Sequence, residues 1–239
     1  MTICKALTIA GSDSGGGAGI QADLKTFQEL GVYGMSVITA VTAQNTMGVQ
    51  GIFSLDEQAV AAQLDAVAED LPPDAVKTGM LGGSNIVQTV AERIRRYGWT
   101  NVVVDPVMIA KGGAPLLREE AVEAVKTLLL PLAKVVTPNI PEAEALVGFR
   151  IETEEDRREA ARKIKAYGAQ TVVIKGGHGQ GESADDLIFD GCEFAVVSGR
   201  RVHSRHTHGT GCTFAAAIAA ELAKGRDVLA AVRTAKRFI

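Results

Sequence analysis

The sequence has few cysteines, no marked excess of charge and no long apolar run. Its three cysteines, Cys4, Cys192 and Cys212, form no CxxC pair and no even set, which argues against a disulfide framework and predicts a reducing cytoplasm. The net charge of −3 leaves no basic stripe for a nucleic acid. No apolar run approaches the roughly 20 residues that cross a bilayer. We therefore expect a cytoplasmic globular protein with neither a nucleic-acid nor a membrane partner.

Two common phosphate-binding motifs are also absent. The sequence contains no Gly-Lys-Ser/Thr, which excludes a P-loop, and no G-x-G-x-x-G, which excludes a dinucleotide fingerprint. The glycine run at residues 15–17, taken alone, marks a flexible surface turn more often than a ligand cradle. Small phosphorylated ligands are still compatible with the composition, because local glycine loops and single lysines bind them without net positive charge.

Short apolar runs alternate with helical spacing over nearly the whole chain. We expect strands at residues 6–10, 36–43, 75–78, 101–104, 135–137 and 171–174. We expect helices at residues 20–30, 55–69, 86–97, 119–130, 138–148, 153–167, 214–224 and 228–238. This order predicts an α/β fold with a parallel sheet covered by helices on both faces. A closed eight-fold barrel is the competing architecture, but a predicted hairpin at residues 187–197 favours an open sheet.

Polar residues and glycines recur directly after the predicted strands. Ligands of open α/β sheets bind beyond the carboxyl ends of the strands, so these positions predict one site. They are residues 11–19, Gln44, residues 79–80, Asp105, Asn139 with Glu142, Lys175 and residues 207–212. Each also has a plain structural interpretation: Asp105 as a turn cap, Asn139 and Glu142 as a helix cap with its reciprocal partner, and Lys175 as a solvated side chain.

The segment 206–213 leads without a break into a predicted helix. A helix start carries unpaired N–H groups and a partial positive charge, so it attracts an oxyanion. Gly209 and Gly211 would let the backbone approach a ligand closely, with Cys212 inside the ring of amides. The alternative is a buried helix start in which Cys212 is a small apolar residue.

Seven motifs together resemble the hydroxymethylpyrimidine/phosphomethylpyrimidine kinases of the ribokinase-like superfamily. These motifs are residues 6–26, 42–46, 77–81, 105–108, 137–142, 175–178 and 207–213. The resemblance implies a ribokinase-like three-layer α/β/α fold with a mostly parallel central sheet, formed by residues 1–239 as a single domain. It also implies two successive ATP-dependent phosphorylations of 4-amino-5-hydroxymethyl-2-methylpyrimidine in thiamine biosynthesis, with Mg²⁺ and commonly in a homodimer.

The same resemblance implies roles for individual residues. Gln44 matches the residue that hydrogen-bonds the pyrimidine. The other positions assigned to the substrate are Gly11, Ala18, Asp23, Thr42, Met80 and Val107. The catalytic group and its anion hole correspond to Gly209, Thr210, Gly211, Cys212 and Lys175. The ATP phosphates correspond to Asn139, Lys175, Thr207, Gly209 and Gly211, and Mg²⁺ corresponds to Asp105 and Glu142.

Two features depart from the family's pattern, and a third distinguishes the chain from sugar-kinase relatives. His206 replaces the Asn expected before Thr-His-Gly. The family usually continues beyond the position of Ile239, so we expect either a truncated copy or an unusually open adenine side. Cys212 stands where sugar-kinase relatives carry an Asp base. Because a helix N-terminus favours a thiolate, we expect Cys212 to act as the base in the first phosphorylation.

Two other functions fit the same scaffold. One is a pyridoxal or pyridoxine kinase, from which Gln44 distinguishes this chain, because an amide can both donate to a ring nitrogen and accept from an exocyclic amine. The other is a non-catalytic ligand sensor that retains the fold. The presence of every expected phosphate residue argues against a sensor.

Overall fold

The computed structural model describes residues 3–108, 119–177, 182–202, 204 and 206–239. His178, the last residue of the 175–178 motif, lies outside these ranges. The described strands form one sheet in the order β3-β2-β1-β4-β5-β6-β7-β8-β9. The strands are β1 (Lys5–Asp13), β2 (Tyr33–Asn45), β3 (Gly48–Ser54), β4 (Ala75–Thr78), β5 (Val102–Val104), β6 (Val135–Val136), β7 (Thr171–Ile174), β8 (Asp186–Phe189) and β9 (Phe194–Val197). Strands β2, β1, β4, β5, β6 and β7 are mutually parallel, which confirms the predicted open sheet.

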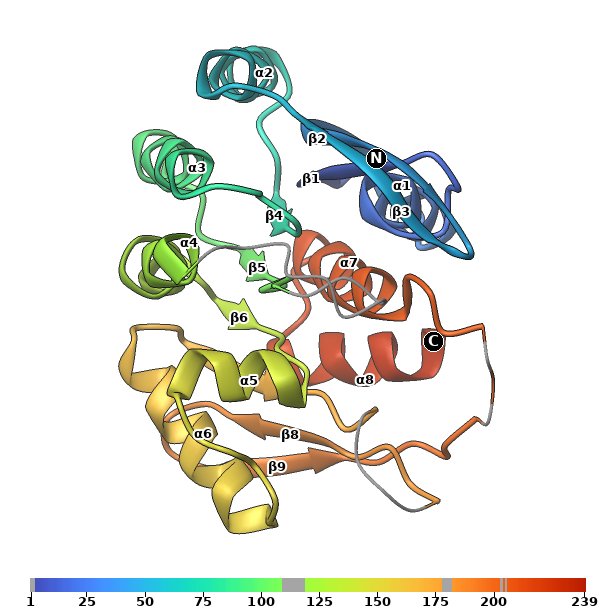
Figure 1. Cartoon of the computed structure of the whole chain (residues 1–239), viewed down its shortest axis with the longest axis vertical. Coiled ribbons are helices and arrows are strands. Elements are labelled where there is room, and N and C mark those ends of the chain that lie inside the picture. The colour runs from blue at the N-terminus through green and yellow to red at the C-terminus, as the bar shows by residue number, and fades with distance from the viewer. Residues whose placement is uncertain (1–2, 109–118, 178–181, 203, 205) are drawn as a thin grey trace.

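Helices cover both faces of the sheet, as predicted (Figure 1). They are α1 (Gly19–Glu29), α2 (Glu57–Asp70), α3 (Ser84–Tyr97), α4 (Glu119–Ala124), α5 (Ile140–Val147), α6 (Glu154–Ala166), α7 (Thr210–Ala223) and α8 (Val228–Phe238). Along β5, Val102 and Val104 join the core under α2 to α6, whereas Val103 joins the core under α1, α7 and α8. Successive strand residues point to opposite faces, so an uninterrupted valine run fills both cores and makes three layers.

The predicted helix at residues 119–130 is irregular in its second half. After α4 the chain forms a π-helical turn at Val125–Leu129 and a 3-10 turn at Leu130–Leu132. Pro131 has no N–H group, so α-helical hydrogen bonding cannot continue through it. Elsewhere the helix signals hold: α6 lies within the predicted helix 153–167, and Thr153 and Asp156 form a reciprocal cap at its start. In the described ranges no helix has the length and apolar character needed to span a membrane.

The region around β2 and β3 differs most from expectation. The sequence pattern predicts a strand ending at residue 43, but β2 continues to Asn45 and pairs antiparallel with β3, which was not predicted. The register shifts between Ala43 and Gln44. Most β3 side chains are exposed, so no alternation of buried and exposed residues marks it as a strand. Strand β1 likewise runs to Asp13, into the expected glycine-rich loop, with a register irregularity between Ala10 and Ser12.

Candidate active site

A cavity of about 960 Å³ opens beyond the carboxyl ends of the parallel strands. Its wall contains almost every residue that the sequence assigned to the site. These are Gly11, Ala18, Thr42, Gln44, Met80, Asp105, Val107, Asn139, Glu142, Lys175, Thr207, Gly209, Thr210, Gly211 and Cys212. The cavity also contacts Asp13 and His208, which lie in the predicted ranges without an assigned role, and residues outside the predicted positions: Lys77, Gly199 to Val202, Lys236 and Ile239. The strand-end argument therefore predicted the location of the site, and it missed charged side chains at both ends.

The start of α7 provides the anion-binding amides. Gly209 caps the helix with a left-handed backbone (φ 81°), and a Cβ there would lie 1.7 Å from the carbonyl oxygen of Gly17. The N–H groups of Gly209, Gly211 and Cys212 donate to no acceptor within the described ranges. The Thr210 N–H makes a long contact of 3.4 Å to the oxygen of Thr207. Three amides are thus available to an oxyanion at this helix start.

Cys212 lies at the cavity wall beside these amides. The N–H of Gly19 donates to its sulfur. Burial raises the pKa of Cys212 to about 11, although the nearby Lys77 ammonium opposes this effect. Burial therefore disfavours the thiolate expected at the helix N-terminus, because its cost exceeds the attraction of Lys77 and of the Gly19 N–H. The role of Cys212 as a base stays a prediction.

Two buried carboxylates flank Lys175. Its Nζ lies 2.9 Å from Asp105 Oδ1 and 4.0 Å from Glu142 Oε2. Asp105 Oδ1 also accepts from the hydroxyl of Thr137 at 3.1 Å. Burial lowers the pKa of Lys175, but Asp105 and Glu142 more than compensate and raise it above its usual range. Lys175 is therefore a charged ammonium within a cluster of oxygen donors.

The carboxylate pair fits a divalent cation. Burial raises the pKa of Glu142 to about 7; Lys175 opposes this, and the negative charge of Asp105 adds to it. Above about pH 7, where Glu142 is ionised, the two carboxylates carry more negative charge than the one ammonium compensates. Mg²⁺ prefers oxygen ligands of this kind, one or two carboxylates being completed by substrate phosphates. Asp105 and Glu142 are therefore suitable for holding Mg²⁺.

Asn139 and Glu142 also form the helix cap that the alternative interpretation expected. Asn139 Oδ1 accepts from the N–H of Glu142 at 2.9 Å, and Glu142 Oε2 accepts from the N–H of Asn139 at 2.8 Å. Both residues line the cavity as well. The cap and the site are compatible, because the cap fixes the position of the carboxylate that faces Lys175.

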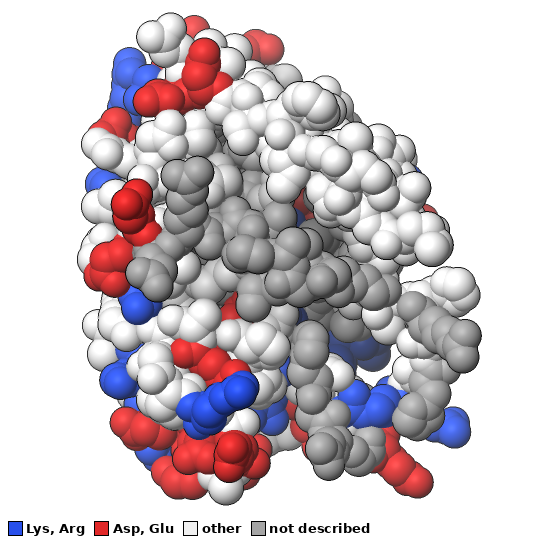
Figure 2. Space-filling model, viewed as in Figure 1, with Lys and Arg blue, Asp and Glu red and all other residues white. Residues whose placement is uncertain are grey.

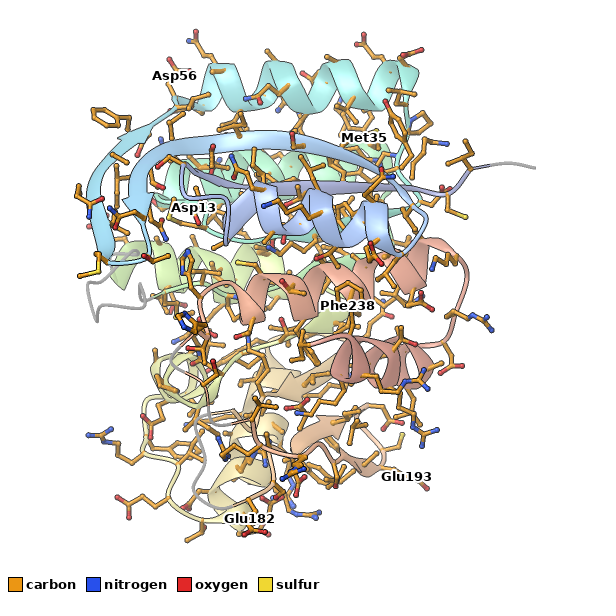
Figure 3. All side chains as sticks on the ribbon, turned by 90° about the vertical axis from the view of Figure 1, so that its right-hand side faces the viewer. Asp13, Met35, Asp56, Glu182, Glu193 and Phe238 are labelled. Carbon is orange, nitrogen blue, oxygen red and sulfur yellow. The ribbon has the colours of Figure 1, made fainter. Side chains whose placement is uncertain are left out.

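The glycine-rich loop after β1 folds around one carboxylate. Asp13 Oδ1 accepts from the N–H of Gly15 at 2.8 Å, and Oδ2 accepts from those of Gly17 at 3.1 Å and Ala18 at 2.9 Å. The loop also bonds Gln44, since Ser14 Oγ donates to its carbonyl oxygen at 2.7 Å. Hydrogen bonds hold the turn in place, but its glycines are largely exposed and none of residues 15–17 lines the cavity, in agreement with a surface turn. The residues on either side of it, Asp13 (labelled in Figure 3) and Ala18, are the ones that reach the cavity wall.

Asp23 is the one assigned residue that does not line the cavity in the described structure. Its side chain is fully buried, and its Oδ2 lies 2.8 Å from Lys77 Nζ and accepts from Thr8 Oγ1 at 2.6 Å. Lys77, in contrast, reaches the cavity wall. The structure therefore places Asp23 behind Lys77, away from the position of a bound ligand.

The open, mostly parallel sheet and an anion site at the start of α7 define a ribokinase-like phosphotransferase. Solved structures agree. A Bacillus subtilis pyridoxal kinase in complex with ADP superposes with a TM-score of 0.93 at 46% identity, covering 100% of this chain and 91% of that chain. A phosphomethylpyrimidine kinase from Clostridium difficile superposes with a TM-score of 0.88 at 45% identity, covering 99% of this chain and 97% of that chain.

The family can be stated more closely. Residues 13–239 match the family described as Phosphomethylpyrimidine kinase. The hydroxymethylpyrimidine/phosphomethylpyrimidine kinase of Bacillus subtilis is 56% identical over 240 residues, which cover 100% of this chain and 89% of that protein. The chain belongs to the phosphomethylpyrimidine kinase family.

Proposed function

We propose that this protein phosphorylates 4-amino-5-hydroxymethyl-2-methylpyrimidine with ATP, and then phosphorylates the monophosphate to the diphosphate, in thiamine biosynthesis. One continuous series of contacts supports this. Gln44 lies against His208, the next residue is Gly209, and a Cβ on Gly211 would lie 3.4 Å from Lys175 Nζ. A side chain suited to bind the pyrimidine, free backbone amides and a buried ammonium therefore follow one another along one cavity. Transfer of a phosphoryl group from ATP to a pyrimidine requires this order.

The catalytic roles follow from charge and position. Phosphoryl transfer needs mainly alignment and charge neutralisation. The free amides of Gly209, Gly211 and Cys212 hold the oxygens of the transferring group, and Lys175 neutralises its charge. Asp105 and Glu142 would hold Mg²⁺, which would neutralise part of the phosphate charge. Cys212 is the candidate base for the hydroxymethyl group in the first step and must first lose its own thiol proton to act as one, whereas a phosphate oxygen needs no base in the second.

The nucleotide belongs at the other end of the cavity. Asn139, Lys175 and Thr207 face the phosphates. Lys236 and Ile239 line the wall beyond them, and Lys236 is held by an ion pair of 2.9 Å with Asp186. The ADP complex of the Bacillus subtilis pyridoxal kinase supports ATP as the phosphoryl donor for this fold. The single sheet that carries all these residues supports one kinase domain.

A homodimer is part of this proposal. The sequence carries no Asp, Glu, Lys or Arg between Leu30 and Leu55, and Figure 2 shows a broad uncharged surface at its upper right, where Figure 1 places β2 and β3. Exposed apolar side chains gather on this hairpin; they are Tyr33, Val41, Met47, Ile52 and Phe53. A second copy of the chain would bury them. Phe53→Asp should therefore lower the mass measured by sedimentation. The cytoplasmic location stays a prediction.

A pyridoxal kinase is the second candidate, because the Bacillus subtilis protein of that name shares 46% identity and the fold. Purified protein with MgATP is therefore given the hydroxymethylpyrimidine or pyridoxal, and products are followed by mass. Appearance of pyrimidine monophosphate and then diphosphate is the expected result. Turnover of pyridoxal alone would favour the second candidate, and pyrimidine binding without release of ADP would favour a sensor. Gln44→Ala should raise the KM for the pyrimidine more than it raises the KM for pyridoxal.

A further inference from the structure

The Asp13 carboxylate fixes the hydrogen-bond role of His208. Asp13 is 3% exposed, and its Oδ2 lies 2.9 Å from His208 Nε2. Burial raises the pKa of Asp13, but bonds from His208 and from the amides of Gly15, Ala18 and Gly17 outweigh burial and hold it below its usual value. An ionised carboxylate only accepts hydrogen bonds, so His208 Nε2 must carry the proton, whether the ring is neutral or charged.

This polarity conflicts with the amide of Gln44 in its present orientation. Gln44 Nε2 lies 3.2 Å from His208 Nε2, so two N–H donors face one another. At the other end, Gln44 Oε1 lies 3.1 Å from the hydroxyl of Thr42. The single proton of that hydroxyl already belongs to the carbonyl oxygen of Ser12, at 2.9 Å. The amide nitrogen of Gln44 therefore faces a second donor, and its amide oxygen faces a second acceptor.

Turning the amide over about its terminal bond resolves both conflicts at once. The oxygen then accepts a share of the His208 N–H, and the nitrogen donates to the Thr42 oxygen. Two independent neighbours, one on β2 and one before α7, thus require the same orientation. One N–H and one lone pair of Gln44 stay unused, and both are available to a ligand in the cavity.

We propose that Asp13 and His208 are positioning residues that fix the Gln44 amide in this turned orientation, and that they thereby select an aminopyrimidine over its oxo analogue. The proposal rests on the proposed function. An aminopyrimidine edge presents a ring-nitrogen acceptor beside an N–H donor, whereas the oxo form presents a ring N–H donor beside a carbonyl acceptor. An amide that cannot turn leaves buried polar groups of the oxo form unpaired, and such mismatches discriminate strongly.

The first test compares kcat/KM for the aminopyrimidine and for its 4-oxo analogue. His208→Phe keeps a ring but removes the donor, so the amide can turn and the preference for the aminopyrimidine should fall by about 10-fold or more. Asp13→Asn should act in the same direction. Ser14→Ala is the matched control, because it loosens the same loop from the backbone of Gln44. It should lower kcat/KM for the aminopyrimidine and for the 4-oxo analogue by the same factor. An unchanged preference in His208→Phe would overturn the proposal.

A second test needs no catalysis. The side-chain ¹⁵N spectrum at pH 8, assigned by comparison with His208→Phe, should show Nε2 of His208 protonated. A neutral ring protonated at Nδ1 alone would overturn the proposal. The two tests separate the possible failures: if the unaltered protein phosphorylates no pyrimidine, the proposed function fails while the spectrum still decides the orientation. If it phosphorylates the aminopyrimidine with no loss of preference in His208→Phe, only the role of His208 and Asp13 is wrong.

Discussion

The ammonium of Lys77 lies 2.8 Å from the carboxylate of Asp23, and both side chains are fully buried. Asp23 Oδ1 has no hydrogen-bond partner among the described residues, so Lys77 and Thr8 are what stabilises this charge. Removing one member of a buried pair leaves the other charge uncompensated, whereas removing both charges avoids that penalty. Lys77 lines the cavity and Asp23 lies behind it, so loss of the pair affects the wall of the site.

Lys77→Met should therefore lower the free energy of unfolding by about 3–5 kcal/mol, because it strands the Asp23 carboxylate. The double variant Lys77→Met/Asp23→Asn should recover most of that loss, since the amide still accepts from Thr8. Urea unfolding at pH 7 measures both. A double variant as unstable as the single one would show that the charge of Asp23 is not what destabilises Lys77→Met.

Continuous apolar strands were the easiest elements to predict. Residues 75–78 and 171–174 have the predicted bounds, because both faces of the parallel sheet are covered and every residue of β4 and β7 is buried. Strand β3 could not be found in the same way, since its exposed side chains leave only backbone pairing to define it. The fold prediction therefore depended on the pattern of apolar residues that become buried, and not on the strand propensity of single residues.

The site was predicted in outline but not in its internal contacts. The ends of the central strands could be located, so Asp105 and Lys175 were found, and Gln44 was found although β2 continues past it to Asn45. The contact of Asp13 with His208 joins residues 195 positions apart, and no spacing in the sequence marks such a pair. Asp23 is an error of the opposite kind, a residue assigned to the site that does not belong to its wall. The motif placed it near the substrate, whereas the packing of α1 against α7 directs it into the core.

Glu142 should make stability depend on pH near neutrality. Its pKa is raised from 4.5 to about 7 by burial and by Asp105, against the opposing effect of Lys175. The folded state therefore holds the proton more tightly than the unfolded state, and the associated stability is present below pH 4.5 and is lost as the pH rises through 7. Glu142→Gln preserves the helix cap and removes this titration. The stability of the unaltered protein relative to Glu142→Gln should fall between pH 5 and 8; a constant difference would contradict the raised pKa.

Cys212 should matter for one phosphorylation and not for the other. An alcohol must lose a proton during transfer, and loss of a general base costs about 10²-fold or more in rate. The phosphate acceptor of the second step is already ionised. Cys212→Ala should therefore reduce kcat for the alcohol strongly and kcat for the monophosphate little. Cys192→Ala, at an exposed position remote from the cavity wall, is the control. Equal losses for both substrates would reject Cys212 as the base.

Glycines at the two ends of α7 allow loss of the anion site to be separated from the effect of backbone strain. A variant at one end changes both, and a variant at the other end changes the strain alone. Gly209 before the helix and Gly225 after it both have left-handed backbones, with φ of 81° and 78°. A Cβ on Gly225 meets nothing within 4 Å, whereas one on Gly209 meets the carbonyl oxygen of Gly17 at 1.7 Å. Gly225→Ala should therefore cost only about 1 kcal/mol of stability and leave the kinetics unchanged.

Gly209→Ala carries the same strain and must also push the start of α7 away from the loop after β1. The free amides then no longer converge, and loss of such donors costs about 10²-fold or more in kcat. Both phosphorylations should suffer together, because both place a transferring phosphoryl group at these amides. Kinetics with each substrate, beside unfolding curves of Gly209→Ala and Gly225→Ala, separate the two effects. If Gly209→Ala loses stability but keeps its kcat for both substrates, the amides at the start of α7 do not hold the transferring group.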